Sequence, residues 1–306
     1  MKNISNEFYD FKKPDFLIVG AAKTGTTALY YYLRENKEIF FPNEKEPNFF
    51  SLRFAKKEWQ DENFNILTLE KYSQLFPRKD SKLVVGEAST SYLRFPEWTI
   101  RSIEELYDNP KELKIIIVLR DPVKRAFSHY AMKVRDGLES KSFLDALDST
   151  VISKRCEIDY TYDYVGFSMY FQQVKAYLNY FDNVKIILHD DFLANPTEVT
   201  NEVCDFLNVS QYELEKAGEK FNAGGVPKEG FAWLHELIFH PSFIKTTLRK
   251  VMPSSVRWWL KSKLGNAIHK ELKITPHEYE EARKLFISDI NSLSQLTKLD
   301  LTRWLS

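Results

Sequence analysis

The sequence predicts an α/β fold, in which a mainly parallel sheet is flanked by helices. Short runs rich in β-branched residues and bounded by charge indicate buried strands. They alternate with segments whose apolar residues recur every three or four positions, which is typical of helices. Such alternation favours parallel strands joined by right-handed crossovers. Because ligands of these sheets bind beyond the carboxyl ends of the strands, the residues that follow each strand are the first candidates for a site.

Four apolar runs are expected to be strands: residues 16–19, 83–85, 115–119 and 184–188. The first is followed by a loop and by helical spacing from Thr26 to Glu35. After the third come Asp121, a favourable N-cap, and Pro122, a favourable first helical residue, and a helix is expected from there. Helical spacing from Phe167 to Phe181 precedes the fourth run.

From about Ala223 the pattern changes to a loop and then to helical segments without clear strands. The last expected helix carries apolar residues from Ala282 to Leu296. Nothing between these segments resembles a linker. Residues 1–306 are therefore predicted to form a single domain, with an α/β core at 1–222 and a helical C-terminal cover at 223–306.

The composition limits the class of protein. The chain has 306 residues, 43% of them hydrophobic, and its 43 basic and 43 acidic side chains cancel to a net charge of zero. An apolar content of this size excludes wholesale disorder, and neutrality argues against nucleic acid as the main partner. Cys156 and Cys204 support neither a disulfide framework nor a zinc cluster. With no apolar run near the ~18–20 residues of a membrane span, we expect a soluble, cytoplasmic protein.

A glycine-containing loop, GAAKTGTT from Gly20 to Thr27, follows the first expected strand and opens a helix. Small residues there let backbone N–H groups approach an anion, and the helix N-terminus adds a favourable dipole. The loop departs from the Walker pattern, because its lysine is Lys23 and Thr26 occupies the usual lysine position. The interpretation is an anion cradle; an ordinary turn beside a solvated lysine is the alternative.

A second basic position, Arg120, ends the third expected strand, and Ser128 follows it on the next helix. Guanidinium and hydroxyl groups suit a phosphate. Residues 120–135 carry five basic and one acidic side chain, a local charge of +4. A charged helix start alone would look the same. Two phosphate-type positions at the ends of two strands nevertheless indicate a nucleotide with phosphates at both ends.

Several ordered motifs resemble those of sulfotransferases that use 3′-phosphoadenosine-5′-phosphosulfate (PAPS). They are GAAKTGTTAL from Gly20, KEPNFF from Lys45, GEASTSYL from Gly86 and IIIVLRDPVKRAFSHY from Ile115. The likeness is closest to bacterial members and to heparan-sulfate-type carbohydrate sulfotransferases, and it covers nearly the whole chain. It implies a P-loop NTPase-like fold and sulfuryl transfer from PAPS to a hydroxyl, which leaves 3′,5′-adenosine bisphosphate (PAP).

The resemblance also implies which residues hold the donor. Those for the 5′-phosphosulfate are Lys23, Thr24, Gly25, Thr26 and Thr27; those for the 3′-phosphate are Arg120 and Ser128; and Lys228 lies in a loop, Asn222–Gly230, that closes over the nucleotide in relatives. The Lys23 ammonium suits the charge that develops on the leaving phosphate. A sulfuryl group carries less negative charge than a phosphoryl group, and no magnesium carboxylate is evident, so no metal is predicted.

The motif match points to Glu46 as the general base, with an ordinary loop glutamate as the alternative. Its aromatic neighbours are expected to raise its pKa by desolvation. Relatives often carry a histidine where Asn48 stands. Glu87, after the second strand, is the other candidate base and is assigned to substrate orientation. His129 is adjacent to Ser128, points about 100° away on the helix, and is expected to be structural.

The acceptor side is less specified. Residues 160–171 are rich in aromatic side chains, which either stack on sugars or enter the core; Tyr160, Tyr162 and Tyr164 are the groove candidates. Residues 241–273 carry eight basic and one acidic side chain, a local +7, with interleaved aromatic and aliphatic residues. This segment could bind an anionic saccharide or an anionic membrane surface, or be a solvated helix with its apolar side in the core.

The leading hypothesis is a cytoplasmic PAPS-dependent sulfotransferase acting on a saccharide or glycoconjugate hydroxyl, with a lipid or polyketide hydroxyl left open. A P-loop kinase of a small metabolite is the second hypothesis; the missing lysine at Thr26 counts against it. A non-catalytic polyanion or membrane-surface binder is the third, and it predicts binding through residues 241–273. The acceptor and the oligomeric state are left open.

Overall fold

The computed structural model describes residues 10–63, 65–215, 226–227, 269–270 and 272–306. Of the expected loop Asn222–Gly230, only residues 226–227 are described, so Lys228 lies outside the described residues. So does most of the basic segment 241–273. For the same reason, the expectation that residues 1–306 form one domain stays a prediction.

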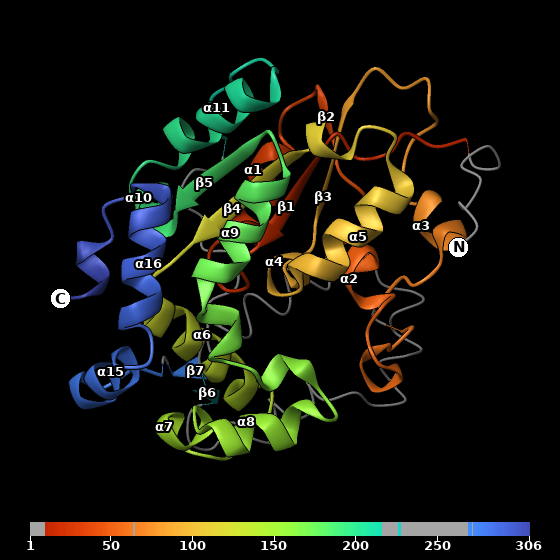
Figure 1. Cartoon of the computed structure of the whole chain (residues 1–306). Helices are drawn as coiled ribbons and strands as arrows, with labels where there is room; N and C mark the ends of the chain where they lie inside the picture. The colour runs from red at the N-terminus through yellow and green to blue at the C-terminus, as the bar shows by residue number, and fades with distance from the viewer. Residues whose placement is uncertain (1–9, 64, 216–225, 228–268, 271) are drawn as a thin grey trace.

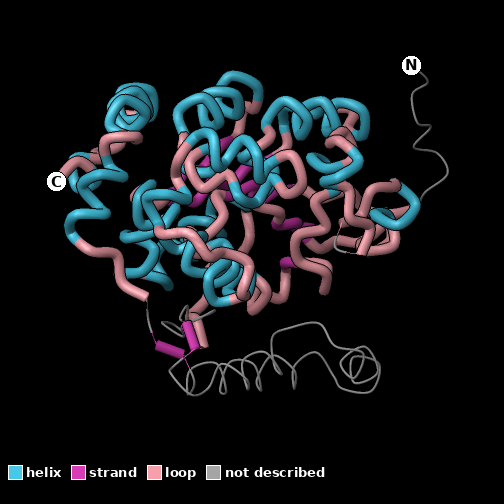
Figure 2. The backbone as a smooth tube through the Cα atoms, turned by 90° about the horizontal axis from the view of Figure 1, so that it is seen from below, coloured by secondary structure: helices cyan, strands magenta, loops and turns pink. Residues whose placement is uncertain are grey.

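The central sheet has five parallel strands in the order β2-β3-β1-β4-β5. The strands are β1 (Phe16–Gly20), β2 (Ile39–Phe40), β3 (Val84–Ala88), β4 (Lys114–Leu119) and β5 (Val184–Leu188). The predicted parallel α/β sheet is confirmed, and all four expected strands are present. Strand β2 escaped prediction because two residues leave no periodic pattern. A separate pair, β6 (Val226–Pro227) and β7 (His269–Lys270), is antiparallel and lies apart from the sheet, in a segment where no strand was expected (Figure 2).

Helices cover both faces of the sheet, as Figure 1 shows. On one face pack α4 (Ser91–Arg94), α5 (Pro96–Leu106), α6 (Pro122–Arg135), α9 (Tyr170–Tyr180) and α16 (Ile287–Thr297). On the other pack α1 (Thr26–Leu33), α10 (His189–Ala194) and α11 (Pro196–Leu207). The remaining α-helices within the described residues are α2 (Phe49–Leu52), α3 (Leu69–Ser73), α7 (Phe143–Ala146), α8 (Ser149–Cys156) and α15 (Pro276–Arg283).

The central strands are buried on both sides, because successive side chains point to opposite faces. In β1, Leu17 and Val19 join the core under α5 and α9, whereas Phe16 and Ile18 join the core under α1 and α11. Strand β4 alternates in the same way. Double burial is why these strands read as continuous apolar runs.

The expected start of α6 is confirmed. The Asp121 carboxylate accepts hydrogen bonds from the N–H groups of Val123 and Lys124, and Pro122 occupies the first turn. An N-cap of this kind stabilises a helix by about 1 kcal/mol. The same carboxylate accepts a hydrogen bond from the Tyr279 hydroxyl at 2.8 Å, which joins α15 to the end of the sheet.

Residues 272–306, the main described part of the C-terminal cover, carry helices as expected, but the single helix expected through Ala282 and Leu296 is wrong. Helix α15 ends at Arg283 and α16 begins at Ile287, with the buried Phe286 at the turn between them. The break lets α15 pack on α6 and α7 while α16 packs on α9. Among the residues that the structure describes, none of the helices has the length and apolar character of a membrane span.

Candidate active site

The loop between β1 and α1 is held by its own polar contacts. The Thr24 side chain is fully buried and its Oγ1 donates to the Ala21 carbonyl at 2.8 Å. The His189 Nδ1 donates to the Thr24 carbonyl, also at 2.8 Å. Gly25 has a φ of +94°, and a Cβ there would come within 3.1 Å of His189 Nδ1. The Thr24 hydroxyl therefore stabilises the loop and is not free to bind a ligand. Glycine is needed at position 25, directly before α1, because its positive φ and the nearby His189 ring disfavour a side chain there.

A cavity of about 720 Å³ lies at the carboxyl ends of β1, β3, β4 and β5. It brings together residues that the sequence predicted separately. The predicted lining residues are Lys23, Gly25, Thr26, Thr27, Glu46, Arg120, Ser128 and Tyr160. This is the edge at which ligands of parallel sheets bind, and these residues come from five segments of the chain.

Lys23 lies half-buried in the wall of this cavity. Its Nζ lies 3.5 Å from the Met132 Sδ, and its backbone has a φ of +70°. Burial, and then the nearby Arg135 guanidinium, lower the pKa of Lys23 to about 8, against the opposing pull of Asp136 and Glu46. The Lys23 ammonium is poorly solvated and has no carboxylate at ion-pair distance among the described residues, so it is favourably placed to bind an anion.

Arg120 stands directly after β4. Its Nη1 donates to the Lys23 carbonyl at 3.2 Å, which ties the two basic positions together. Its Nε is buried and has no hydrogen-bond partner among the described residues. A buried donor without an acceptor is costly, so this guanidinium indicates a site for an anionic group. Ser128, on α6, lines the same cavity.

Glu46 lies in the loop before α2, and its side chain is 40% exposed. The Lys45 Nζ donates to its Oε1 at 2.6 Å. Burial by itself would raise the pKa of Glu46, but Lys45, Lys23 and a hydrogen bond from Thr90 outweigh it and hold the pKa below its ordinary value. The expected rise in pKa is therefore wrong. Its aromatic neighbours turn into the core, so ammonium groups rather than rings surround the carboxylate.

Glu87 does not reach the cavity, which corrects its assignment to substrate orientation. It is fully buried on the face of β3 that also carries Val85. Its carboxylate accepts hydrogen bonds from the hydroxyls of Tyr72, Tyr92 and Ser89 at 2.9, 2.8 and 2.7 Å. Burial raises the pKa of Glu87 to about 7. Successive side chains of β3 point to opposite faces of the sheet, and that of Glu87 points into the core. No local pattern predicted the tyrosines that donate hydrogen bonds to it.

Comparison with known proteins agrees with this geometry. Residues 13–222 match the family model described as the sulfotransferase domain. The chain belongs to the sulfotransferase family. Its fold and its family both follow the expectation drawn from the motifs, and members of this family take their sulfuryl group from PAPS.

A solved sulfotransferase from Alicyclobacillus acidocaldarius is 29% identical with a TM-score of 0.70, over 96% of this chain and 99% of that one. The membrane-associated sulfotransferase kil1 of Dictyostelium discoideum is 32% identical over 40% of this chain and 23% of its own. Heparan sulfate glucosamine 3-O-sulfotransferase 5 of Mus musculus is 27% identical over 66% of this chain and 56% of its own. The chain therefore spans between about a quarter and about half of the length of the Dictyostelium and mouse relatives, whereas it spans nearly all of the Alicyclobacillus protein.

Only one of the three predicted groove tyrosines of this sulfotransferase lines the cavity, and that is Tyr160. Tyr164 is fully buried and donates to Glu139 Oε2 at 3.0 Å. The Tyr162 hydroxyl donates to the Leu138 carbonyl at 2.8 Å, outside the cavity lining. For Tyr162 and Tyr164 the groove assignment is corrected: both serve the wall behind the cavity.

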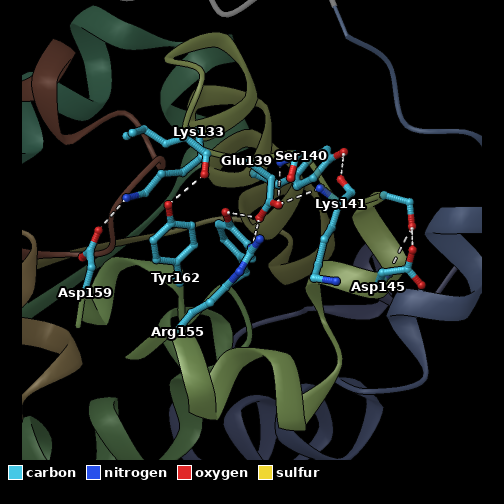
Figure 3. A network of polar contacts seen from close by, with 12 residues as sticks. Lys133, Glu139, Ser140, Lys141, Asp145, Arg155, Asp159 and Tyr162 are labelled. Carbon is cyan, nitrogen blue, oxygen red and sulfur yellow. Dashed lines mark hydrogen bonds and ion pairs between the residues drawn. The ribbon is translucent and has the colours of Figure 1, made fainter. Parts of the chain in front are cut away.

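Figure 3 shows this wall, with Tyr162 between two ion pairs. Lys133 Nζ lies 2.9 Å from Asp159 Oδ2 and 4.3 Å from the centre of the Tyr162 ring. The Arg155 guanidinium pairs with Glu139 and lies 4.9 Å from the same ring. The wall is therefore held by cation–π contacts and by two ion pairs, in each of which one partner, Lys133 or Glu139, is buried.

The local charge of +4 at residues 120–135 is only partly directed at the cavity. Lys133 pairs with Asp159, and Arg135 pairs with its neighbour Asp136 at 2.8 Å. Arg125 is fully buried and donates to Ser168 Oγ and to the Tyr164 carbonyl. Within the described part of the segment, Arg120 is the cavity-lining cation without a carboxylate partner at ion-pair distance.

Several lining residues were not predicted from the sequence. They are Ala22, Ala28, Asn48, Thr90, Ser91, His129, Met132, Lys133, Asp136, Leu138, Thr161, Phe167 and His189. Thr90 and Ser91 lie two and three residues after β3, and His189 directly follows β5, so the strand-end rule could have found these three. The others depend on how α6 and the segment 136–167 fold back, which leaves no local signal. His129 touches the cavity but is buried and contacts Arg125, as its expected structural role requires.

Proposed function

We propose that this sulfotransferase moves a sulfuryl group from PAPS to a hydroxyl of a saccharide or glycoconjugate. The observation that carries the proposal is that one cavity holds an anion-seeking pair, Lys23 and Arg120, together with an ionised carboxylate, Glu46. The saccharide class is supported by relatives that are named as heparan sulfate and carbohydrate sulfotransferases.

The residues present fit the donor. The N-terminus of α1, with Thr26 and Thr27, and the Lys23 ammonium would hold the 5′-phosphosulfate, and Arg120 and Ser128 would hold the 3′-phosphate. The unpartnered Nε of Arg120 is the feature that an anionic group satisfies. Bound PAPS supplies a phosphate–sulfate anhydride, whose S–O bond is the one that breaks.

The chain's own residues would supply the rest of the chemistry. The Glu46 carboxylate accepts the proton of the attacking hydroxyl while the new S–O bond forms, and its lowered pKa keeps it ionised at neutral pH. The Lys23 ammonium neutralises the charge left on the departing phosphate oxygen. The negative charge of the bound donor offsets the Lys23 charge that lowers the pKa of Glu46. The pKa of Glu46 therefore rises in the loaded enzyme, and its carboxylate becomes a stronger base.

The proposal is tested in two stages. Calorimetry with PAP establishes whether the donor site binds, and a mass-spectrometric screen for an added sulfate, with PAPS supplied, identifies acceptors among sugars, lipids and polyketides. Glu46→Gln should lower turnover by about 10²–10⁴-fold while the PAP Kd stays within about twofold. The matched control is Glu44→Gln, which changes an exposed glutamate of the same loop outside the cavity lining.

Failure to bind PAP would refute the donor assignment, and magnesium-dependent ATP use in its place would favour the kinase hypothesis. Full turnover in the Glu46→Gln variant would remove only the base. Cytoplasmic location and surface binding through residues 241–273 stay predictions.

A further inference from the structure

The loop that carries Glu46 adopts an unfavourable backbone conformation. Glu46 has a φ of +62° and Asn48 a φ of +57°, both in the left-handed region. This region costs about 1–2 kcal/mol for Glu46 and less for Asn48, because asparagine tolerates the left-handed conformation better than other non-glycine residues. A segment with two such residues keeps its shape only where contacts from outside the segment hold it.

Several of the contacts that hold it come from the carboxyl end of β3, and two more come from Asn65 and Ile66. The Glu46 N–H donates to the Ala88 carbonyl at 3.0 Å, and the Asn48 N–H donates to Ser89 Oγ at 3.1 Å. Ser91 Oγ donates to Asn48 Oδ1 at 2.6 Å. The Asn48 side-chain amide in turn donates to the Glu46 carbonyl at 2.9 Å. The strained loop is thus docked, residue by residue, on the segment that follows β3.

Ser89 is the point at which this docking meets the buried core. A serine hydroxyl has one hydrogen, and here that hydrogen is donated to Glu87 Oε1 at 2.7 Å. The hydroxyl oxygen therefore turns a lone pair toward the Asn48 N–H. The second oxygen of Glu87 accepts from Tyr72 and Tyr92, and both Ser89 and Glu87 are fully buried. The carboxylate consequently fixes the direction of the serine hydroxyl.

We propose that Ser89 is a positioning residue for Glu46, which it holds through the Asn48 N–H, and that Glu87 acts by orienting the Ser89 hydroxyl. The inference rests on the proposed function for the role of Glu46 as base. It gives the buried Glu87 a part in the site although its carboxylate does not reach the cavity.

The first test needs no acceptor. Hydrogen–deuterium exchange of the intact protein should be compared for Ser89→Ala and for a matched control, Ser102→Ala. Ser102 is also fully buried, on α5, and its Oγ has no hydrogen-bond partner among the described residues. Loss of one buried hydrogen bond should speed exchange in peptides covering residues 44–50 about tenfold in the Ser89 variant and leave the control unchanged. Equal exchange in the two variants would overturn the proposal.

The second test separates positioning of the base from general stability. With PAPS and an acceptor from the screen, Ser89→Ala should lower kcat about tenfold while the PAP Kd stays within about twofold. In the Glu46→Gln background the same change should have no further effect on kcat, because it acts through the carboxylate that is already absent. If Ser89→Ala lowered kcat in the Glu46→Gln background as much as it does in the wild-type protein, the proposal would be contradicted. A wild-type protein that binds no PAP would sink the proposed function, whereas the exchange experiment would still decide whether Ser89 holds the loop.

Discussion

PAP binding near pH 8 should take up protons, and Lys23 should be the group that gains them. Burial and the nearby Arg135 place the pKa of Lys23 at about 8, so about half of the free protein carries a neutral amine at that pH. A bound phosphate favours the ammonium form and raises the pKa again. Binding at pH 8 should therefore be linked to protonation of Lys23.

The magnitude follows from the titration curve. If binding returns the pKa of Lys23 to its ordinary value of 10.5, about half a proton is taken up at pH 8 and about a tenth of a proton at pH 7. The protonated fraction of the free protein falls from about 0.9 at pH 7 to about 0.1 at pH 9, so the PAP Kd should weaken about tenfold over this range. Calorimetry in two buffers with different ionisation enthalpies measures the uptake directly.

Two variants that each remove one positive charge provide the control. Lys23→Met should abolish the uptake and flatten the pH dependence. Lys124→Met should change neither, because the Lys124 side chain is 52% exposed and outside the cavity lining. An uptake near zero for the wild-type protein at pH 8, or an undiminished uptake in Lys23→Met, would refute this reasoning.

Three further predictions concern affinity and stability. Arg120→Met should weaken PAP binding about 10–100-fold, as expected for a lost charged hydrogen bond, whereas Lys124→Met should change it little. Calorimetry gives both Kd values. An unchanged Kd in the Arg120 variant would show that the phosphate binds elsewhere. Because folding raises the pKa of Glu87 from 4.5 to about 7, the folded state holds a proton that the unfolded state releases, and wild-type stability should fall by about 3 kcal/mol from pH 4.5 to pH 8 through this group. Urea unfolding should show that fall reduced in Glu87→Gln, and an identical pH profile would count against it. Gly86→Ala should destabilise by at least about 1–3 kcal/mol, since a Cβ there would come within 2.3 Å of the Phe16 ring; an unchanged unfolding midpoint would show that the ring moves freely.

Local sequence patterns were enough to predict much of the fold and the basic residues expected to bind the donor. Strands β1 and β4 were visible because burial on both faces demands continuous apolar runs. Lys23 and Arg120 were visible because they lie within three residues of the ends of those strands, and the ends of parallel strands meet at one edge of the sheet. The N-cap at Asp121 needed only two neighbouring residues to be recognised.

The orientation of side chains beyond these elements was not visible. Glu87 lies within β3 and Thr90 lies two residues after it, yet Glu87 is enclosed by tyrosines and Thr90 lines the cavity. Tyr160 and Tyr164 diverge in the same way. In each pair the difference depends on contacts with residues from other segments of the chain, such as Tyr72 for Glu87 and Glu139 for Tyr164.

The sequence by itself determined the family, the four longer strands of the sheet and the basic residues that follow β1 and β4, because each of these follows from contacts between near neighbours and from motif spacing. Only the tertiary structure decided that Glu46 has a lowered pKa rather than a raised one, and that Ser89 and Glu87 lie behind its loop. A pKa and a hydrogen-bond direction depend on all charges and donors within a few ångströms, and those come from segments such as α3 and β3 that the chain brings together only when it folds.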